Sequence, residues 1–218
     1  CGQMSAWYIF SALGLYPLDP ASGEYEMTEP LTVSAPLALK GQDGANVKGA
    51  FILSGEVGSF KLDKLSFTDS GAGVFITLAD AGVTASEILV ENTSLDGYSK
   101  SIIYGNYDNA NVDKVVFRNI ETRNWGTGQG VFDFRKGTYG AMMILDNTIT
   151  GGRDLIRADA NCVIGDILIA SNTFDGLTLG NGNGVLYVRA TTASFKVMNN
   201  LFLNEFKEGS STILSKTS

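Results

Sequence analysis

The sequence contains no histidine and is poor in cysteine and proline. Without histidine, the catalytic triads, proton transfers and metal sites that depend on imidazole are excluded. The two cysteines, Cys1 and Cys162, are too few for a disulfide scaffold. Cys162 lies in the apolar run NCVIGDILIA, so we expect it to be a buried free thiol.

Long hydrophobic runs and an excess of positive charge are also missing. No stretch forms the ~20 apolar residues of a membrane span, and the opening lacks the basic start of a signal peptide, so we expect neither. The net charge of −7 argues against general binding to nucleic acid or anionic membranes. The 218 residues are 44% apolar and include 26 glycines, which favours one turn-rich domain. We expect it to be a monomer.

A repeated pattern runs through most of the chain. Short β-rich runs such as KLSFTDS, EILVENTS, KVVFRNIE and MMILDNTIT each end at a polar residue. These polar residues follow one another at spacings of 23, 27, 28, 25 and 28, and they are Asp69, Asn92, Asn119, Asn147, Asn172 and Asn200. A repeat of this length indicates a solenoid. We interpret the column as a structural asparagine ladder, in which stacked amides satisfy the backbone of the turns.

A second strand follows each of these runs. The segments are GVFITLAD, KSIIYGNY, GVFDFRKG, GRDLIRAD, GVLYVRAT and SSTILSKT. Two matched strands per repeat predict an all-β fold, a right-handed parallel β-helix of roughly seven coils, which we assign to residues 21–218. Residues 1–20 are predicted to cap the first coil, because an open solenoid end exposes strand edges. Within them, QMSAWYIFSALG favours a short helix that ends at Gly14.

The opening CGQMSAWYIFSALGLYPLDPASGEYE closely resembles a signature of glycoside hydrolase family 92, the calcium-dependent exo-α-mannosidases. The resemblance covers about the first 26 residues. In that family the motif belongs to a helical catalytic domain of several hundred residues, and its associated acidic residues lie before the cysteine. The resemblance therefore implies a mannosidase-like fragment that lacks the family's catalytic residues.

The remainder, about residues 22–218, resembles the pectate-lyase-like β-helix proteins of bacterial glycan-utilisation loci. Segments such as VFDFRKG, GGRDLIRAD and VLYVRAT carry this resemblance, and many such proteins are domains of unknown function. The resemblance implies a β-helix, a polysaccharide partner, and an extracellular, cell-surface or periplasmic location. It says little about chemistry, because one fold serves many functions.

Cations recur beside the second strand of the repeat. They occur in the dipeptides Phe134-Arg135, Ile156-Arg157, Val188-Arg189 and Ser215-Lys216. If they stack one coil apart they repel each other, and they need acidic neighbours or an anionic ligand. Asp133, Asp154 and Asp159 flank the arginines. Two interpretations stay open: a ladder of ion pairs, or a groove that binds carboxylate- or sulfate-bearing sugars through guanidinium groups.

Aromatic residues near this face are candidates for stacking on sugar rings. Trp125 stands out because it lies in the glycine-rich loop RNWGTGQG. The others are Tyr98, Tyr104, Tyr107, Tyr139 and Tyr187. The residues that we predict to bind an acidic polysaccharide are Arg135, Arg189, Trp125, Asp133 and Asp159.

A polysaccharide-lyase-like enzyme acting on uronate polymers is the alternative to simple binding. The β-helix lyases typically use Lys or Arg as the base, and Lys136 and Arg157 are the candidates because they lie about one coil apart. We expect no cofactor and assign no metal ligands. A calcium site would need several converging carboxylates, for which Asp133, Asp154 and Asp159 are the one plausible group.

Overall fold

The fold is a right-handed parallel β-helix, as the repeats predict. The computed structural model describes residues 15–19, 24–41, 45–178, 184–204 and 214–215. Strands account for 75% of the structure, and the backbone makes about six turns, close to the number expected. The part of the chain described contains no helix.

Several strands stay extended around a corner of the solenoid and are therefore long. In chain order the strands are β1 (Leu15–Asp19), β2 (Glu24–Met27), β3 (Leu31–Val33), β4 (Leu37–Lys40), β5 (Asn46–Lys48), β6 (Phe51–Asp63), β7 (Ser66–Thr68), β8 (Ile76–Asp96), β9 (Ile103–Gly105), β10 (Ala110–Arg123), β11 (Trp125–Leu145), β12 (Thr148–Ala170), β13 (Thr173–Asp175), β14 (Leu186–Val188), β15 (Thr191–Met198), β16 (Leu201–Leu203) and β17 (Leu214–Ser215).

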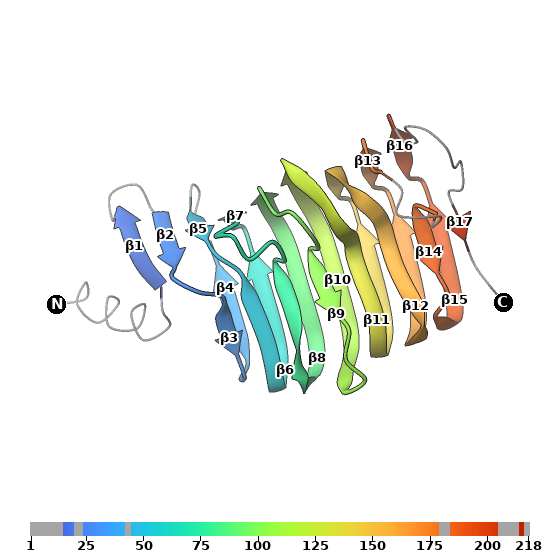
Figure 1. The fold of residues 1–218 in the computed structure, drawn as a ribbon, viewed down its shortest axis with the longest axis horizontal. Coiled ribbons are helices and arrows are strands. Elements are labelled where there is room, and N and C mark those ends of the chain that lie inside the picture. The colour runs from blue at the N-terminus through green and yellow to red at the C-terminus, as the bar shows by residue number, and fades with distance from the viewer. Residues whose placement is uncertain (1–14, 20–23, 42–44, 179–183, 205–213, 216–218) are drawn as a thin grey trace.

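Apart from β1, which pairs antiparallel with β2, the strands stack in parallel into three columns. The stack runs from β2 near one end of the molecule to β17 at the other (Figure 1). Column one contains β2, β5, β7, β13, β16 and parts of β8, β10 and β12. Column two contains β3, β9, β14, β17 and parts of β6, β8, β11 and β12. Column three contains β4, β15 and parts of β6, β8, β10, β11 and β12. Along each strand of a column, successive side chains point alternately to the core and to the surface.

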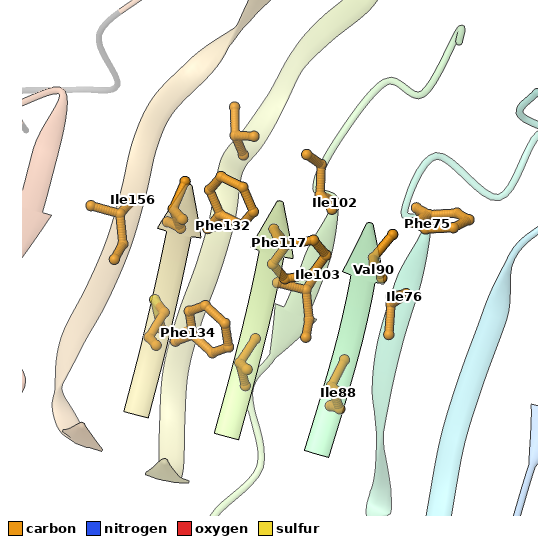
Figure 2. Close-up of a cluster of buried hydrophobic side chains, with 14 of the residues drawn as sticks. Phe75, Ile76, Ile88, Val90, Ile102, Ile103, Phe117, Phe132, Phe134 and Ile156 are labelled. Carbon is orange, nitrogen blue, oxygen red and sulfur yellow. The ribbon is translucent and has the colours of Figure 1, made fainter. Parts of the chain in front are cut away.

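The core is a stack of apolar side chains that point inward from all three columns. In column two the inward position is Phe51, Ile76, Ile103, Phe132, Ile156 and Leu186 in successive coils. These six side chains are at most 2% exposed. Figure 2 shows how Phe132 and Phe134 of column two and Phe117 of column three lie within the cluster. The core holds the columns in register, and the outward positions are fixed with them.

The predicted asparagine column proves to be two adjacent columns. At the corner between columns three and one, one residue per coil has a positive φ of 51–58°, and these residues are Lys64, Asn92, Asn119, Asp146, Ser171 and Asn199. Asn92 and Asn119 therefore occupy a left-handed turn position, which asparagine tolerates. Their side chains are exposed, and Asn119 Nδ2 donates to Asn92 Oδ1 at 2.9 Å.

The inward ladder occupies the next position along the chain, at Asn147, Asn172 and Asn200. Asn147 Nδ2 donates to Asn172 Oδ1 at 2.9 Å, and Asn172 Nδ2 donates to Asn200 Oδ1 at 2.8 Å. The Nδ2 atoms of Asn147 and Asn172 also donate to the backbone carbonyl oxygens of Phe117 and Ile144. These amides satisfy buried backbone groups, so their predicted structural role is confirmed.

Asp69 belongs to neither column, which corrects its place in the predicted ladder. It follows β7 in column one, whereas EILVENTS starts in column three. Its carboxylate accepts hydrogen bonds from the backbone N–H groups of Gly71 at 3.0 Å and Gly73 at 3.1 Å. Asp69 therefore fixes the loop that leads into column two.

The predicted capping helix falls in residues 1–14, outside the described residues. The described end of the predicted cap is β1, which pairs antiparallel with β2. Because β2 pairs with β5 on its other side, β1 gives this first strand of column one a second partner. None of the described residues forms a helix long and apolar enough to cross a membrane.

Candidate functional site

A row of polar and aromatic side chains lies on the outer surface of column two. Tyr104 of β9 is in register with Asp133 of β11, Asp133 with Arg157 of β12, and Arg157 with Tyr187 of β14. Two residues further along the respective strands come Arg135, Asp159 and Arg189. We call these seven residues the charged face. The rigid core beneath them fixes their spacing.

Two arginine–aspartate forks occupy the centre of the charged face. Arg135 donates from Nε to Asp133 Oδ1 and from Nη2 to Asp133 Oδ2, both at 3.0 Å. Arg157 makes the same fork with Asp159, at 3.2 and 3.0 Å. The Asp133 side chain is fully buried, whereas that of Asp159 is 22% exposed. Both forks are bidentate, the geometry that holds a guanidinium most firmly.

The arginines do not form the continuous cation column that the dipeptides suggested. Arg157 is in register with Asp133, not with Arg135. Residues of opposite charge, such as Asp133 and Arg157, are therefore neighbours on adjacent coils. Attraction between the coils replaces the repulsion that we expected. The hydrogen bonds to Asp133 have the largest effect in raising the pKa of Arg135, against the opposing effect of burial, and Asp159 makes a smaller contribution. Lys216, the fourth predicted cation, lies outside the described residues.

Two half-buried tyrosines border the forks. The guanidinium of Arg135 lies over the ring of Tyr104, 5.3 Å from its centroid, and that of Arg157 lies 6.0 Å from the ring centroid of Tyr187. Both distances suit cation–π contacts. Arg189 is exposed and donates from Nη1 to Tyr187 Oη at 3.0 Å. Arg189 has no carboxylate partner among the residues that the structure describes.

Lys136 and Arg157, the predicted catalytic pair, are held by different carboxylates. Lys136 lies at a register shift after Phe134, and its Nζ pairs with Asp108 Oδ2 at 2.8 Å. Arg157 is held in its fork with Asp159. Both side chains therefore donate to a carboxylate in this structure.

Trp125 is placed inside the solenoid, which corrects its interpretation as an exposed sugar platform. Its side chain stacks on Tyr98 with 5.3 Å between ring centroids, and the residue is 6% exposed. Its indole N–H donates to the backbone carbonyl of Lys100 at 2.8 Å. Tyr98 and Tyr139 are likewise buried. Of the aromatic candidates, Tyr104 and Tyr187 are those that belong to the charged face.

A hollow of about 320 Å³ opens beside Tyr104, on the N-terminal side of the charged face. Ile52, Thr77 and Tyr104 line it from the outer row of column two. Val74 and Lys100 line it from the loops before β8 and β9, and Gln129 lines it from the first part of β11. Lys100 and Gln129 were not predicted as site residues. The nearby glycine-rich segment is the one local feature of the sequence that points to them, because the repeat pattern does not mark a lysine in a loop.

Acidic residues near the charged face are held by cations and not gathered into a metal site. The third aspartate of the predicted group, Asp154, is buried and lies 3.5 Å from Arg153 Nε. Within the described ranges, no three His, Cys, Asp or Glu side chains are placed to hold a metal ion. The charged face offers guanidinium–carboxylate forks and tyrosine rings with their hydroxyl groups.

Comparison with known protein families identifies a similarity over the first part of the chain. Residues 1–75 match the glycosyl hydrolase family 92 catalytic domain. The match agrees with the resemblance of the opening segment and extends beyond its 26 residues, through β7 and the loop to Phe75. It covers 75 of the 218 residues. No curated protein and no solved structure matches the chain.

Proposed function

We propose that this protein binds a polysaccharide along the charged face. The observation that carries the proposal is the pair of half-buried tyrosines, Tyr104 and Tyr187, on either side of Asp133 and Arg157 in one row. Tyrosine rings supply apolar surface for sugar rings and polar groups at their edges. The partly exposed side chains of Arg135, Arg157 and Asp159 offer donors and acceptors for sugar hydroxyl groups, whereas the buried Asp133 holds Arg135 in place. The similarity of residues 1–75 to a glycosidase family supports a carbohydrate partner.

An acidic polysaccharide suits the charge of this surface. The charged face carries three arginines against two aspartates, on a protein whose net charge is −7. Arg189 bonds a neutral phenol oxygen, so its remaining donors can meet a carboxylate or sulfate group. In keeping with a polysaccharide partner, we propose an extracellular, cell-surface or periplasmic location.

Binding is favoured over lyase chemistry by the state of the candidate bases. A lyase base must give up its proton near neutral pH. Lys136 and Arg157 donate to carboxylates. The function proposed is therefore recognition of the polymer without cleavage.

Affinity electrophoresis and calorimetry with polygalacturonate, alginate and a neutral glucan test this proposal. Tyr187→Ala and Tyr104→Ala should each weaken binding by about tenfold, because each removes one aromatic surface. Tyr107→Ala is the matched control, since Tyr107 is a half-buried tyrosine on the turn before β10. Loss of binding in all three variants, or in none, would contradict the proposed face. Ultraviolet absorbance of an unsaturated sugar end would establish a lyase instead.

A further inference from the structure

Lys100, like Arg189 and unlike Arg135 and Arg157, has no carboxylate partner among the residues that the structure describes. Its side chain is exposed and forms no ion pair with any residue that the structure describes. It lines the hollow together with Tyr104 and Gln129. A lysine ammonium without a partner is a strong donor for an anionic group.

Glycines on both sides form a close-fitting support for Lys100. A Cβ atom added at Gly128 would lie 3.0 Å from Lys100 Cγ, and one added at Gly73 would lie 3.4 Å from Lys100 Cδ. The stem of the lysine thus passes between the loop that contains Gly73 and the first part of β11, which contains Gly128. A larger residue at Gly128 would also press on the backbone oxygen of Ser99, at 2.7 Å. These glycines leave the lysine a defined place at the hollow.

Hydrogen bonds fix the backbone of Lys100 from the same two sides. Its N–H donates to the carbonyl oxygen of Gly73 at 2.8 Å. Its own carbonyl oxygen accepts from the indole N–H of Trp125 at 2.8 Å. Gly128 N–H donates to the Ser99 carbonyl oxygen at 2.9 Å. Trp125 is therefore a positioning residue for Lys100.

The remaining lining of the hollow suits a single sugar ring. Its volume of about 320 Å³ is at the lower end of the range for small-molecule sites. Ile52 and Val74 offer apolar surface, while Thr77 and Gln129 offer hydrogen-bonding groups. Tyr104 belongs both to the hollow and to the charged face. A chain that lies on the charged face can therefore reach the hollow with one ring.

We propose that this hollow binds a sugar ring that bears an anionic group, with Lys100 as the residue that contacts the anion. The inference rests on the proposed function, because it specifies where the acidic group of the polysaccharide is read. Lys100 forms a charge-assisted hydrogen bond with the anion. Tyr104, Ile52 and Val74 contact the ring, and Trp125 holds Lys100 in place.

Substitution of two exposed lysines tests the inference. Lys100→Met keeps an unbranched stem and removes the charge, while Lys196→Met makes the same change on column three. Each variant is titrated with polygalacturonate, a sulfated galactan and neutral galactan. Lys100→Met should weaken polygalacturonate binding by about ten- to a hundredfold, and Lys196→Met should not. Equal weakening of the sulfated polymer assigns the site to anions generally, and weakening of polygalacturonate alone assigns it to carboxylates.

A monosaccharide experiment separates this inference from the proposed function. Galacturonate should shift the NMR signal of the Lys100 Cε group in the intact protein, whereas galactose should not. If Lys100→Met binds every polymer as the wild type does while Tyr187→Ala weakens binding, the hollow is not the anion site and the charged face is retained. If no polymer binds but galacturonate still shifts Lys100, the proposed function is wrong and the hollow stands. Absence of any shift and of any Lys100→Met effect overturns the inference.

Discussion

Asn172 Oδ1 accepts two hydrogen bonds from Asn147, one from the backbone N–H at 2.8 Å and one from Nδ2 at 2.9 Å. Both residues are 1% exposed, so the pair lies where water cannot replace a lost partner. The exposed contact between Asn119 and Asn92 joins the same kinds of atoms at the surface. The two pairs allow the effect of burial on an otherwise similar amide contact to be measured.

Asn172→Ala should lower the free energy of unfolding by about 1–3 kcal/mol, because it leaves the N–H of Asn147 and the carbonyl of Ile144 without partners. Asn119→Gly is the control. Glycine accepts the left-handed conformation at that position, and the lost contact is exposed, so the change should be below about 0.5 kcal/mol. Urea denaturation measures both. Equal effects would show that burial of the ladder does not matter.

Asp133→Asn should destabilise the protein by about 1–3 kcal/mol, because it weakens a fork whose carboxylate is fully buried. Asp108→Asn makes the same chemical change in the Lys136 ion pair, where the carboxylate is 71% exposed. That variant should lose less than about 0.5 kcal/mol. Thermal unfolding of both, followed by circular dichroism, is the measurement. A harmless Asp133→Asn would mean that the fork contributes nothing to the fold.

Glu87 should make stability depend on pH in the acid range. The hydrogen bond from Lys61, followed by that from Lys114, lowers the pKa of Glu87 against the opposing effect of burial. The unfolded carboxyl titrates near pH ~4.3, so the stabilisation is complete above that pH and is lost as the pH falls through the lower folded value. Glu87→Gln should therefore be less stable than wild type at pH 7, by about 1 kcal/mol or less.

The Glu87 prediction is tested by measuring the free energy of unfolding from about pH 2 to about pH 7, a range that covers the titration of carboxyl groups. The gap between Glu87→Gln and wild type should close toward the acid end. A gap that is constant across the range, or that widens in acid, would contradict the assignment of this carboxyl.

Cys162 should resist alkylation in the native protein. Burial is the main reason that its pKa is raised to about 12, with a smaller contribution from Asp159. The thiol is therefore protonated as well as inaccessible at mildly alkaline pH. Mass spectrometry of the Cys162 peptide after iodoacetamide treatment should show modification only in denaturant. Rapid native labelling would mean that this part of the core opens readily.

The sequence was sufficient to predict the solenoid because each coil repeats its pattern of apolar and polar residues. The predicted segment GVFDFRKG contains the observed Phe132–Phe134 part of column two, and GVLYVRAT contains β14. Inward and outward positions alternate with a period of two. The regular alternation identifies the strands, but it does not determine which residue of one coil is in register with which residue of the next.

Errors in register explain the corrections to the site. Phe132 and Phe134 both point inward, so a slip of two residues preserves the alternation. The predicted alignment of Ile156-Arg157 with Phe134-Arg135 contains this slip of two residues, because Arg157 is in register with Asp133. The slip concealed the alternation of positive and negative charges between coils. Asn119 and Asn147 were aligned because asparagine suits both a left-handed turn and an amide ladder. Lys100 was missed because its place depends on Gly73 and Trp125, which lie in the coils on either side.

The segments that connect column one with column two give the proposed binding side of this protein a modular construction. Each coil returns to the same register in column two, although the segments 69–75, 97–102 and 151–155 differ in length and composition. Stacked strands maintain the frame, so a loop can be exchanged without displacing the strand that follows. Recognition can therefore change one coil at a time, in evolution or by design, while the hydrophobic interior is left as it is.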